Sequence, residues 1–238
     1  MVLEENKDNI QEIYEEIKSR IINQEYTAET KLNQINIANE LGVSRTPVIK
    51  ALYMLQSQRL VDNIPNKGFY VHKVSLTEMV ELYKLRQAIE MVAVVDVAEI
   101  APVEELVKLK SIFEPFIDQP TIDVAAYAKS DQMFHDRLVE LSNNSILQHT
   151  NQSILILPKA YTAGLLRSPK ETLPEHLDLV EALMNRDAEA AQLISKKHID
   201  LSLIPIKIAL QGLLKIGIDP QKITIDDISL DSRIAVSK

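Results

Sequence analysis

The sequence has no cysteine, no tryptophan and only five glycines in 238 residues. The absence of cysteine excludes disulfides, thiolate metal sites and cysteine nucleophiles, and it suits a reducing cytoplasm. No apolar run approaches the roughly 20 residues that a membrane-spanning helix needs. Residues 1–14 are too acidic for a signal peptide. We therefore expect a cytoplasmic protein with no membrane partner.

Hydrophobic residues make up 46% of the chain, which is long enough for two domains with separate cores. The formal net charge is -8. Residues 31–75 depart from this acidic average, because six cations stand there against only Glu40 and Asp62. A basic segment inside an acidic protein is typical of a local DNA footprint.

Residues 35–60 predict two short helices joined by a tight turn. Ile35, Ala38 and Leu41 share one face of the first helix, and Gly42 supplies the turn. Ser44 is the expected cap of the second helix, where its hydroxyl can accept a hydrogen bond from a free backbone N–H. We expect the second helix to bury the stripe of Val48, Leu52 and Leu55.

The other surface of the second helix offers donors to phosphates and base edges, from Arg45, Thr46 and Lys50. A β-hairpin follows, with Lys67 and Gly68 in its turn, and this wing provides a second phosphate contact. The alternative is a small helical domain with a hairpin and no DNA partner.

Helical periodicity covers most of the remaining chain. Ile10, Ile13, Tyr14, Ile17 and Ile21 predict an amphipathic helix before the helix-turn-helix. Further helices are expected at 77–99, 102–118, 121–143, 145–167, 172–185 and 188–214. Pro158 and Pro205 should kink or shorten two of them.

These elements place the chain in the mainly α class, with an N-terminal winged helix-turn-helix and a C-terminal all-α antiparallel helical bundle. We assign residues 1–74 to the DNA-binding domain and residues 75–215 to the effector-binding bundle. Residues 216–238 form a tail without a clear period, and they receive no role.

Ionisable side chains fall on inward faces of three predicted helices. Asp131 and His135 are four residues apart, so they share a helix face that continues into Leu138. His176 and His198 lie on the apolar stripes of two later helices. Burying such groups without partners costs about 2 to 7 kcal/mol each. One carboxylate and three imidazoles suit zinc, nickel or another borderline divalent ion, with room for an added ligand.

Two alternatives remain for this cluster. The four residues could pair among themselves in a polar core, or the domain could be a metal-dependent hydrolase of the HD type with the adjacent pair His135 and Asp136. Asp136 is turned by about 100° from His135 on a helix. No carboxylate is evidently placed as a general base, so the pattern favours a sensor over a catalyst.

Two motifs, residues 41–52 and 65–71, resemble the GntR family of bacterial transcription regulators. Residues 131–144, 175–183 and 187–201 are similar to the effector domain called FCD, which occurs in the FadR-like branch of that family. In metal-binding members of this branch an aspartate and three histidines hold the ion, and by motif they match Asp131, His135, His176 and His198.

Residues 82–90 look like the opening helix of that domain, whose arginine, here Arg86, faces the effector pocket. A surface salt bridge to Glu90 is the alternative role of Arg86. The resemblance implies a dimeric repressor that binds double-stranded operator DNA and responds to a small organic acid at the metal.

Overall fold

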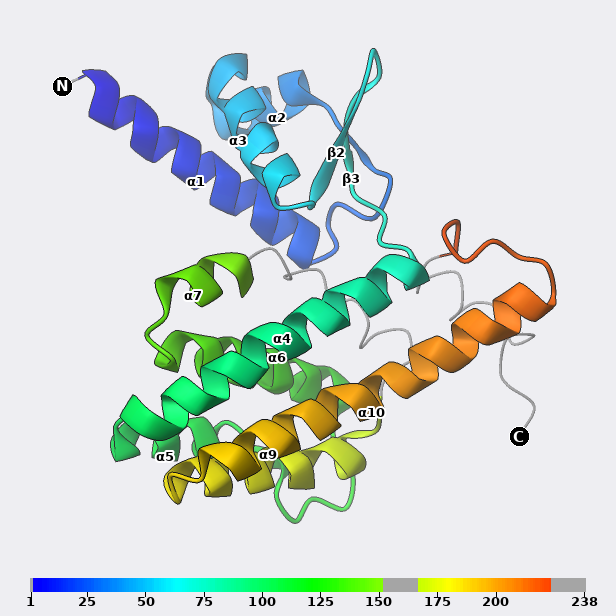
Figure 1. Ribbon diagram of the computed structural model, residues 1–238. Helices are drawn as coiled ribbons and strands as arrows, with labels where there is room; N and C mark the ends of the chain where they lie inside the picture. The colour runs from blue at the N-terminus through cyan, green and yellow to red at the C-terminus, as the bar shows by residue number, and fades with distance from the viewer. Residues whose placement is uncertain (1, 152–166, 224–238) are drawn as a thin grey trace. The chain divides into compact units, whose positions relative to one another are not determined.

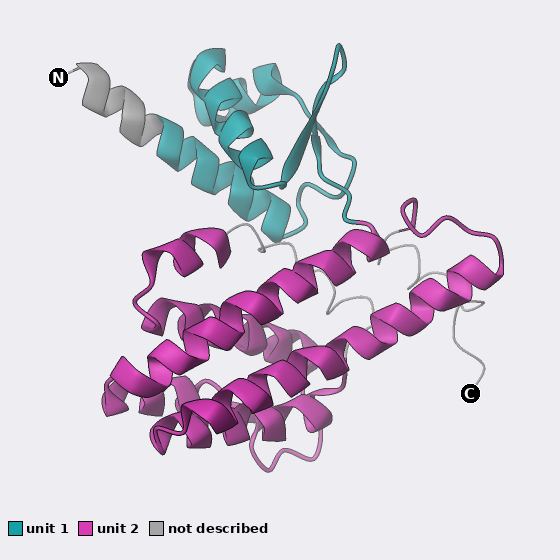
Figure 2. Ribbon diagram, viewed as in Figure 1, with its two compact units in different colours: residues 1–74 teal, residues 75–238 magenta. Residues whose placement is uncertain are grey.

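The computed structural model describes residues 2–151 and 167–223, and the chain divides into two compact units, residues 1–74 and 75–238 (Figure 2). Unit 1 contains the helices α1 (Val2–Ile22), α2 (Gln34–Leu41) and α3 (Arg45–Ser57). Its sheet contains β1 (Lys31–Leu32), β2 (Val61–Ile64) and β3 (Gly68–Val71), in the order β1-β3-β2. Both strand pairs are antiparallel, and the hairpin pairs Val61 with Val71 and Ile64 with Gly68.

The core of unit 1 lies where α1 packs on α3. The expected stripe of α3 is confirmed, because Val48, Leu52 and Leu55 are fully buried. The expected stripe of α1 is buried as well, from Ile13 to Ile21. Burying three such aliphatic side chains contributes about 1.5 to 3 kcal/mol each.

Two details of the helix-turn-helix prediction are wrong. Ile35 is 56% exposed, because the buried face of α2 is made by Ile37 and Ala38. Ser44 does stand at the N-cap of α3 with an extended backbone, but its hydroxyl makes no capping bond. A side-chain cap occurs instead on α2, where Asn33 accepts from two backbone N–H groups. Gly42 adopts φ 67°, as the turn requires.

Unit 2 is a helical bundle, which confirms the predicted fold class (Figure 1). Its helices are α4 (Leu76–Ile100), α5 (Val103–Ser111), the 3₁₀ turn η1 (Glu114–Phe116), α6 (Val124–Leu141), α7 (Ser145–Asn151), α9 (Pro169–Met184) and α10 (Ala188–Lys215). The two longest, α4 and α10, lie side by side, and α6 packs on α4 while α9 packs on α10.

Several predicted helix ends are wrong, and proline explains most of them. The helix expected at 102–118 ends at Ser111, and Pro115 lies in the separate turn η1. The helix expected at 172–185 begins at Pro169, because proline is tolerated in a first turn that needs no N–H donor. Pro205 does not interrupt α10, which continues to Lys215. Pro158 and the end of the 145–167 helix lie outside the described residues.

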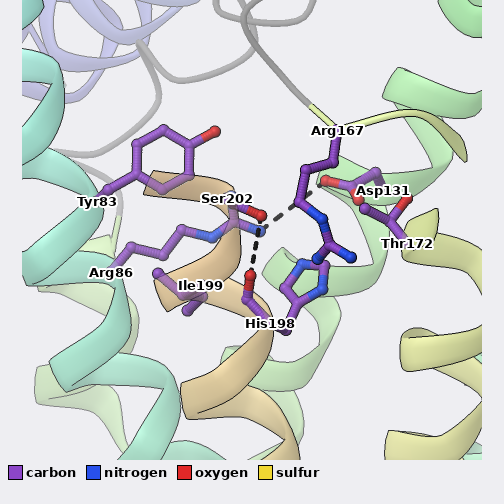
Figure 3. A pocket seen from close by; sticks show the side chains of 8 residues that line it. All are labelled: Tyr83, Arg86, Asp131, Arg167, Thr172, His198, Ile199 and Ser202. Carbon is purple, nitrogen blue, oxygen red and sulfur yellow. Dashed lines mark hydrogen bonds and ion pairs between the residues drawn. The ribbon is translucent and has the colours of Figure 1, made fainter. Parts of the chain in front are cut away.

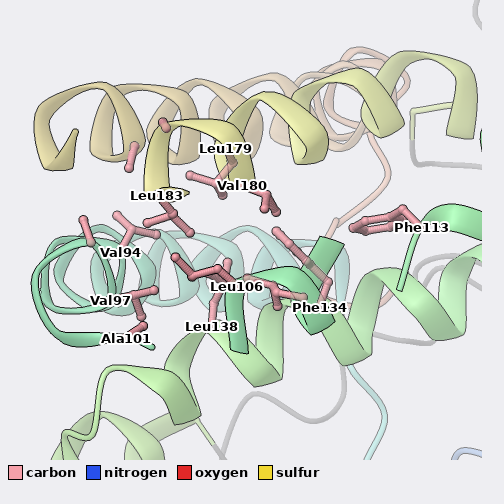
Figure 4. Packing of buried hydrophobic residues seen from close by; sticks show 14 of the residues in the cluster. Val94, Val97, Ala101, Leu106, Phe113, Phe134, Leu138, Leu179, Val180 and Leu183 are labelled. Carbon is pink, nitrogen blue, oxygen red and sulfur yellow. The ribbon is translucent and has the colours of Figure 1, made fainter. Parts of the chain in front are cut away.

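The apolar core of unit 2 fills the space between α4, α5, α6 and α9 (Figure 4). Val94, Phe113, Phe134, Leu138 and Val180 are fully buried there. Phe113 also stacks on the ring of His176, with ring centroids 4.6 Å apart and nearly parallel planes. The core therefore fixes the imidazole of one candidate ligand.

Two further features complete the fold. The backbone N–H of Leu76, at the start of α4, donates to the carbonyl of Ile223 at 3.0 Å, so the first part of the tail contacts the bundle. Within the described ranges, no helix is both long enough and apolar enough to cross a membrane.

Candidate metal centre and DNA-binding surface

Three helices of unit 2 bring the four predicted ligands together. Asp131 and His135 lie one turn apart on α6, His176 lies on α9 and His198 on α10. One possible ligand atom from each lies within 4.8 Å of all the others. All four residues are buried, with exposures between 1% and 6%.

Each histidine is oriented through its Nδ1 atom by a partner outside the cluster. Nδ1 of His135 donates to Glu90 at 2.8 Å, and Nδ1 of His198 donates to Glu175 at 2.8 Å. Nδ1 of His176 lies 3.0 Å from the hydroxyl of Tyr127. Since a carboxylate only accepts, the Nδ1 atoms of His135 and His198 must carry the proton. In the neutral rings Nε2 then presents a lone pair.

The candidate ligand atoms of the four side chains lie close to one another. Nε2 of His135 lies 3.2 Å from Nε2 of His176, and Oδ1 of Asp131 lies 3.3 Å from the latter atom. Oδ2 of Asp131 is buried without a hydrogen-bond partner, 3.9 Å from Nη2 of Arg86. A proton on Nε2 of His176 would satisfy the first two contacts but would leave Oδ2 of Asp131 without a donor. A divalent metal ion suits all four side chains, so the group could hold one.

Burial and neighbouring charges set the protonation of the centre. Burial, reinforced by His198 and His135, lowers the pKa of His176 well below its usual range. Burial also lowers the pKa of His198 despite the hydrogen bond to Glu175. For Glu90, burial acts to raise the pKa, but His135 and Arg86 outweigh it and hold the pKa at about 2. Neutral imidazoles and ionised carboxylates are the forms that bind metals.

Asp131 and His198 also line a small pocket, which Arg86 of α4 borders (Figure 3). Nε of Arg86 donates to Glu90 at 2.6 Å, while its Nη2 lies 3.9 Å from Oδ2 of Asp131 and is buried without a hydrogen-bond partner. The salt bridge considered for Arg86 is therefore formed, although it is buried and not on the surface. A free donor of the same guanidinium points at the pocket.

The HD-type pair is not assembled. Asp136 is outside the ligand group, and its carboxylate accepts from Asn151 at 3.0 Å. Two carboxylates, those of Glu90 and Glu175, do lie beside the centre. Each of them is already bonded to a histidine and an arginine, so neither is free to act as a general base.

In unit 1 the predicted DNA contacts are exposed on α3 and the hairpin. The side chains of Arg45, Thr46 and Lys50 are exposed, and Arg45 donates to Gln34 of α2 at 2.8 Å. Lys67 is exposed at the hairpin turn, and Gly68 adopts φ 100°, which favours glycine. The wing is tied to α3 by an edge-to-face contact of two rings, Tyr53 and Phe69.

Comparison with known proteins agrees with both units. Residues 9–71 match the profile of the bacterial regulatory proteins of the gntR family, and residues 81–201 match the FCD domain. The chain belongs to the GntR family. It is 28% identical to the uncharacterised regulator YdhC of Bacillus subtilis over 195 residues, which cover 79% of this chain and 84% of that protein.

Two other relatives support the same assignment. The repressor RspR of Escherichia coli is 23% identical to this GntR-family chain over 193 residues, covering 79% of this chain and 85% of RspR. A GntR structure from Rhodococcus sp. RHA1 shares the fold, with a TM-score of 0.68 and 19% identity over 84% of this chain and 98% of that one. The protein is thus a helix-turn-helix transcriptional regulator with an FCD domain. GntR regulators bind operator DNA and typically form dimers.

Four residues that surround the candidate ligands were not identified from the sequence as part of the site. They are Glu90, Glu175, Thr172 and Arg167. Only Glu90 carried a usable signal, because it lies in line with Val94 and Val97 on the apolar face of α4. A carboxylate on such a stripe needs a buried partner.

Proposed function

We propose that this regulator is a metal-containing repressor whose affinity for its operator changes when a small organic acid binds beside the metal. The carrying observation is the convergence of Asp131 and three histidines on one point, with imidazole lone pairs and an orphaned carboxylate oxygen facing inward. The relation to RspR, a named repressor, favours repression over activation.

The proposed ligands are Asp131, His135, His176 and His198, and the proposed ion is zinc or nickel. Three imidazoles and one carboxylate are borderline ligands that suit either ion. When bound, the positively charged ion would offer a coordination position to a carboxylate oxygen of the acid. Arg86 would take the acid's other oxygen through its unpartnered Nη2.

The proposed DNA contacts are Arg45, Thr46 and Lys50 on α3, with Lys67 and Gly68 on the wing. In a homodimer two copies of α3 would read half-sites about one helical turn, roughly 34 Å, apart. The operator is therefore expected to be a short palindrome.

Native mass spectrometry of the purified protein, paired with elemental analysis, tests the metal and the dimer together. We expect a dimer with one ion per subunit, and His176→Ala and His198→Ala should each lower the metal content. His149→Ala changes an exposed histidine of α7 and serves as the matched control. A wild-type protein that takes up neither zinc nor nickel, when purified without chelator, would contradict the proposal.

A further inference from the structure

Two arginines border the pocket beside the proposed metal. Arg86 reaches it from α4, and Arg167, two residues before α9, reaches it from the opposite side (Figure 3). Each arginine is also tied to a glutamate that holds a ligand histidine. Arg86 donates a hydrogen bond to Glu90, and Arg167 donates two hydrogen bonds of 2.7 Å to Glu175. Each arginine–glutamate pair is formally neutral.

The charges around this pocket can be counted. Among the residues that the structure describes, two arginines stand against three carboxylates, those of Glu90, Asp131 and Glu175. The three imidazoles must be neutral to bind a metal. The protein groups alone therefore carry one net negative charge, and a divalent ion converts this to one net positive charge.

Water does little to screen that charge. Arg86, Glu90 and Asp131 are 5%, 1% and 1% exposed, and the side chains of Arg167 and Glu175 are mostly buried. An unbalanced charge in such surroundings is costly, so the charge of a ligand must match the charge of the site.

We infer that the metal-loaded pocket selects small acids with a single negative charge and discriminates against dicarboxylates of the same size. This inference rests on the proposed metal site. One carboxylate neutralises the single positive charge, whereas a second would remain unpaired. The described residues that line the pocket include no third cation, and the remaining polar ones offer mainly hydroxyls, from Tyr83, Thr172 and Ser202.

One consequence follows from the same count. Metal-free protein should not bind the acid, because its pocket carries a net negative charge. The free volume of the pocket is about 10 Å³, so the lining side chains must move outward to admit any acid.

The test compares succinamate with succinate, which have nearly the same shape and differ by one negative charge. Acetate serves as the smallest monoanion. Each acid is titrated calorimetrically into the zinc-loaded full chain and into the same protein after chelation, with metal content measured in parallel. We expect succinamate to bind roughly tenfold or more tightly than succinate, and neither acid to bind the metal-free protein.

Two variants change the net charge of the metal-loaded pocket in opposite directions. Glu175→Gln keeps an oxygen that can accept from His198 but raises the charge of the loaded pocket to two, so the preference should shift toward succinate. Arg167→Gln lowers that charge to zero, so both acids should bind roughly tenfold more weakly. Glu181→Gln makes the same charge change as Glu175→Gln at an exposed position of α9 and should leave the preference unchanged.

The outcomes separate the two claims. Failure to take up metal would overturn the proposed function and this inference with it. A metal-loaded wild type that binds succinate as tightly as succinamate, or that responds to no monoanion, would overturn the inference and leave the metal site intact. The inference is also wrong if neither charge variant alters the binding of the two acids.

Discussion

Glu90 contacts both a candidate metal ligand and the arginine proposed to bind the acid. One of its oxygens accepts from His135 and the other from Arg86, so the same carboxylate orients a proposed metal ligand and a proposed acid-binding residue. A carboxylate behind a ligand histidine fixes the tautomer and raises the basicity of the imidazole. The strength of metal binding should therefore depend on a residue that does not touch the metal.

Glu90→Gln should weaken metal binding by about tenfold, since partners of this kind contribute roughly 10- to 100-fold to affinity. The amide removes the negative charge but keeps the shape, so the fold should persist. Competition with a chromophoric chelator measures the affinity. Glu99→Gln, at an exposed position on the same helix, is the control. Equal affinities for all three proteins would show that Glu90 is only structural.

The buried histidines should also make the metal-free protein sensitive to acid. Burial lowers the pKa of His176 and His198 in the folded state from a usual value of 6.5, so the unfolded chain binds more protons than the folded chain below that pH. Stability is then complete above pH 6.5 and falls as the pH drops below it, by up to about 1.4 kcal/mol per pH unit for each histidine.

Chemical unfolding of the chelated protein at several pH values measures this loss. The loss caused by Glu90 should begin only below its usual pKa of 4.5, because its pKa in the fold is about 2. The two effects therefore occupy different pH ranges. His198→Gln should reduce the loss near pH 6.5, and His149→Gln should not. A stability that stays constant from neutral pH down to 4.5 would contradict the assignment.

The convergence of the four candidate ligands could be predicted from the sequence, but their partners mostly could not. The spacing of Asp131 and His135 fixes them on one helix face, and the apolar stripes around His176 and His198 turn those rings inward. Glu90 is 45 residues from His135, and Glu175 is 23 residues from His198. Such pairings arise from how helices pack, and helical periodicity does not encode them.

At the scale of elements, α3 and the wing carry the proposed DNA-reading surface. Arg45 stands in the first turn of α3, where a side chain can reach a base edge, while Lys67 stands at the hairpin turn, where it can reach a phosphate. These two contacts should differ in how they respond to salt and to the DNA sequence.

Arg45→Ala should cost about 1 to 3 kcal/mol in operator binding and relax specificity at one position. Lys67→Ala should weaken binding to all sequences alike and reduce the salt dependence by about one counterion. Gel-shift titrations at several salt concentrations distinguish the two effects. Lys110→Ala, on an exposed position of α5, is the control. An Arg45→Ala protein with unchanged operator affinity would contradict the assignment.

The presence of the helices could be predicted from the sequence. Their end residues and the faces that they bury could be predicted less well. The ends of α4 and α10 were located within a residue or two, because Ser75 and Asp187 cap their starts and Pro102 follows the end of α4. Periodicity misjudged α2, whose eight residues contain too few turns to fix the buried face. It also overestimated the effect of Pro205, since a proline within a long packed helix removes one hydrogen bond without ending the helix.

At the scale of the whole molecule, α4 is the covalent link between the two functions. It follows β3 of the wing after residues 72–75 only, and the same helix carries Arg86 and Glu90 into the bundle. An acid held between the metal and Arg86 would tether α4 to α6, α9 and α10. A change in the position of α4 should then alter the spacing of the two recognition helices in a dimer.

The acid can change operator binding only if it binds the two spacings with different affinity. A coupling of about 1 to 3 kcal/mol would change operator affinity by roughly 5- to 150-fold. Linkage requires that operator DNA change the affinity for the acid by the same factor. Small monocarboxylic acids are therefore titrated into the zinc-loaded protein with and without operator DNA. An acid that binds equally in both titrations is not the effector.

Arg86→Ala should weaken the binding of the true effector while the metal content remains unchanged, and normal binding to that variant would rule out the tether through α4.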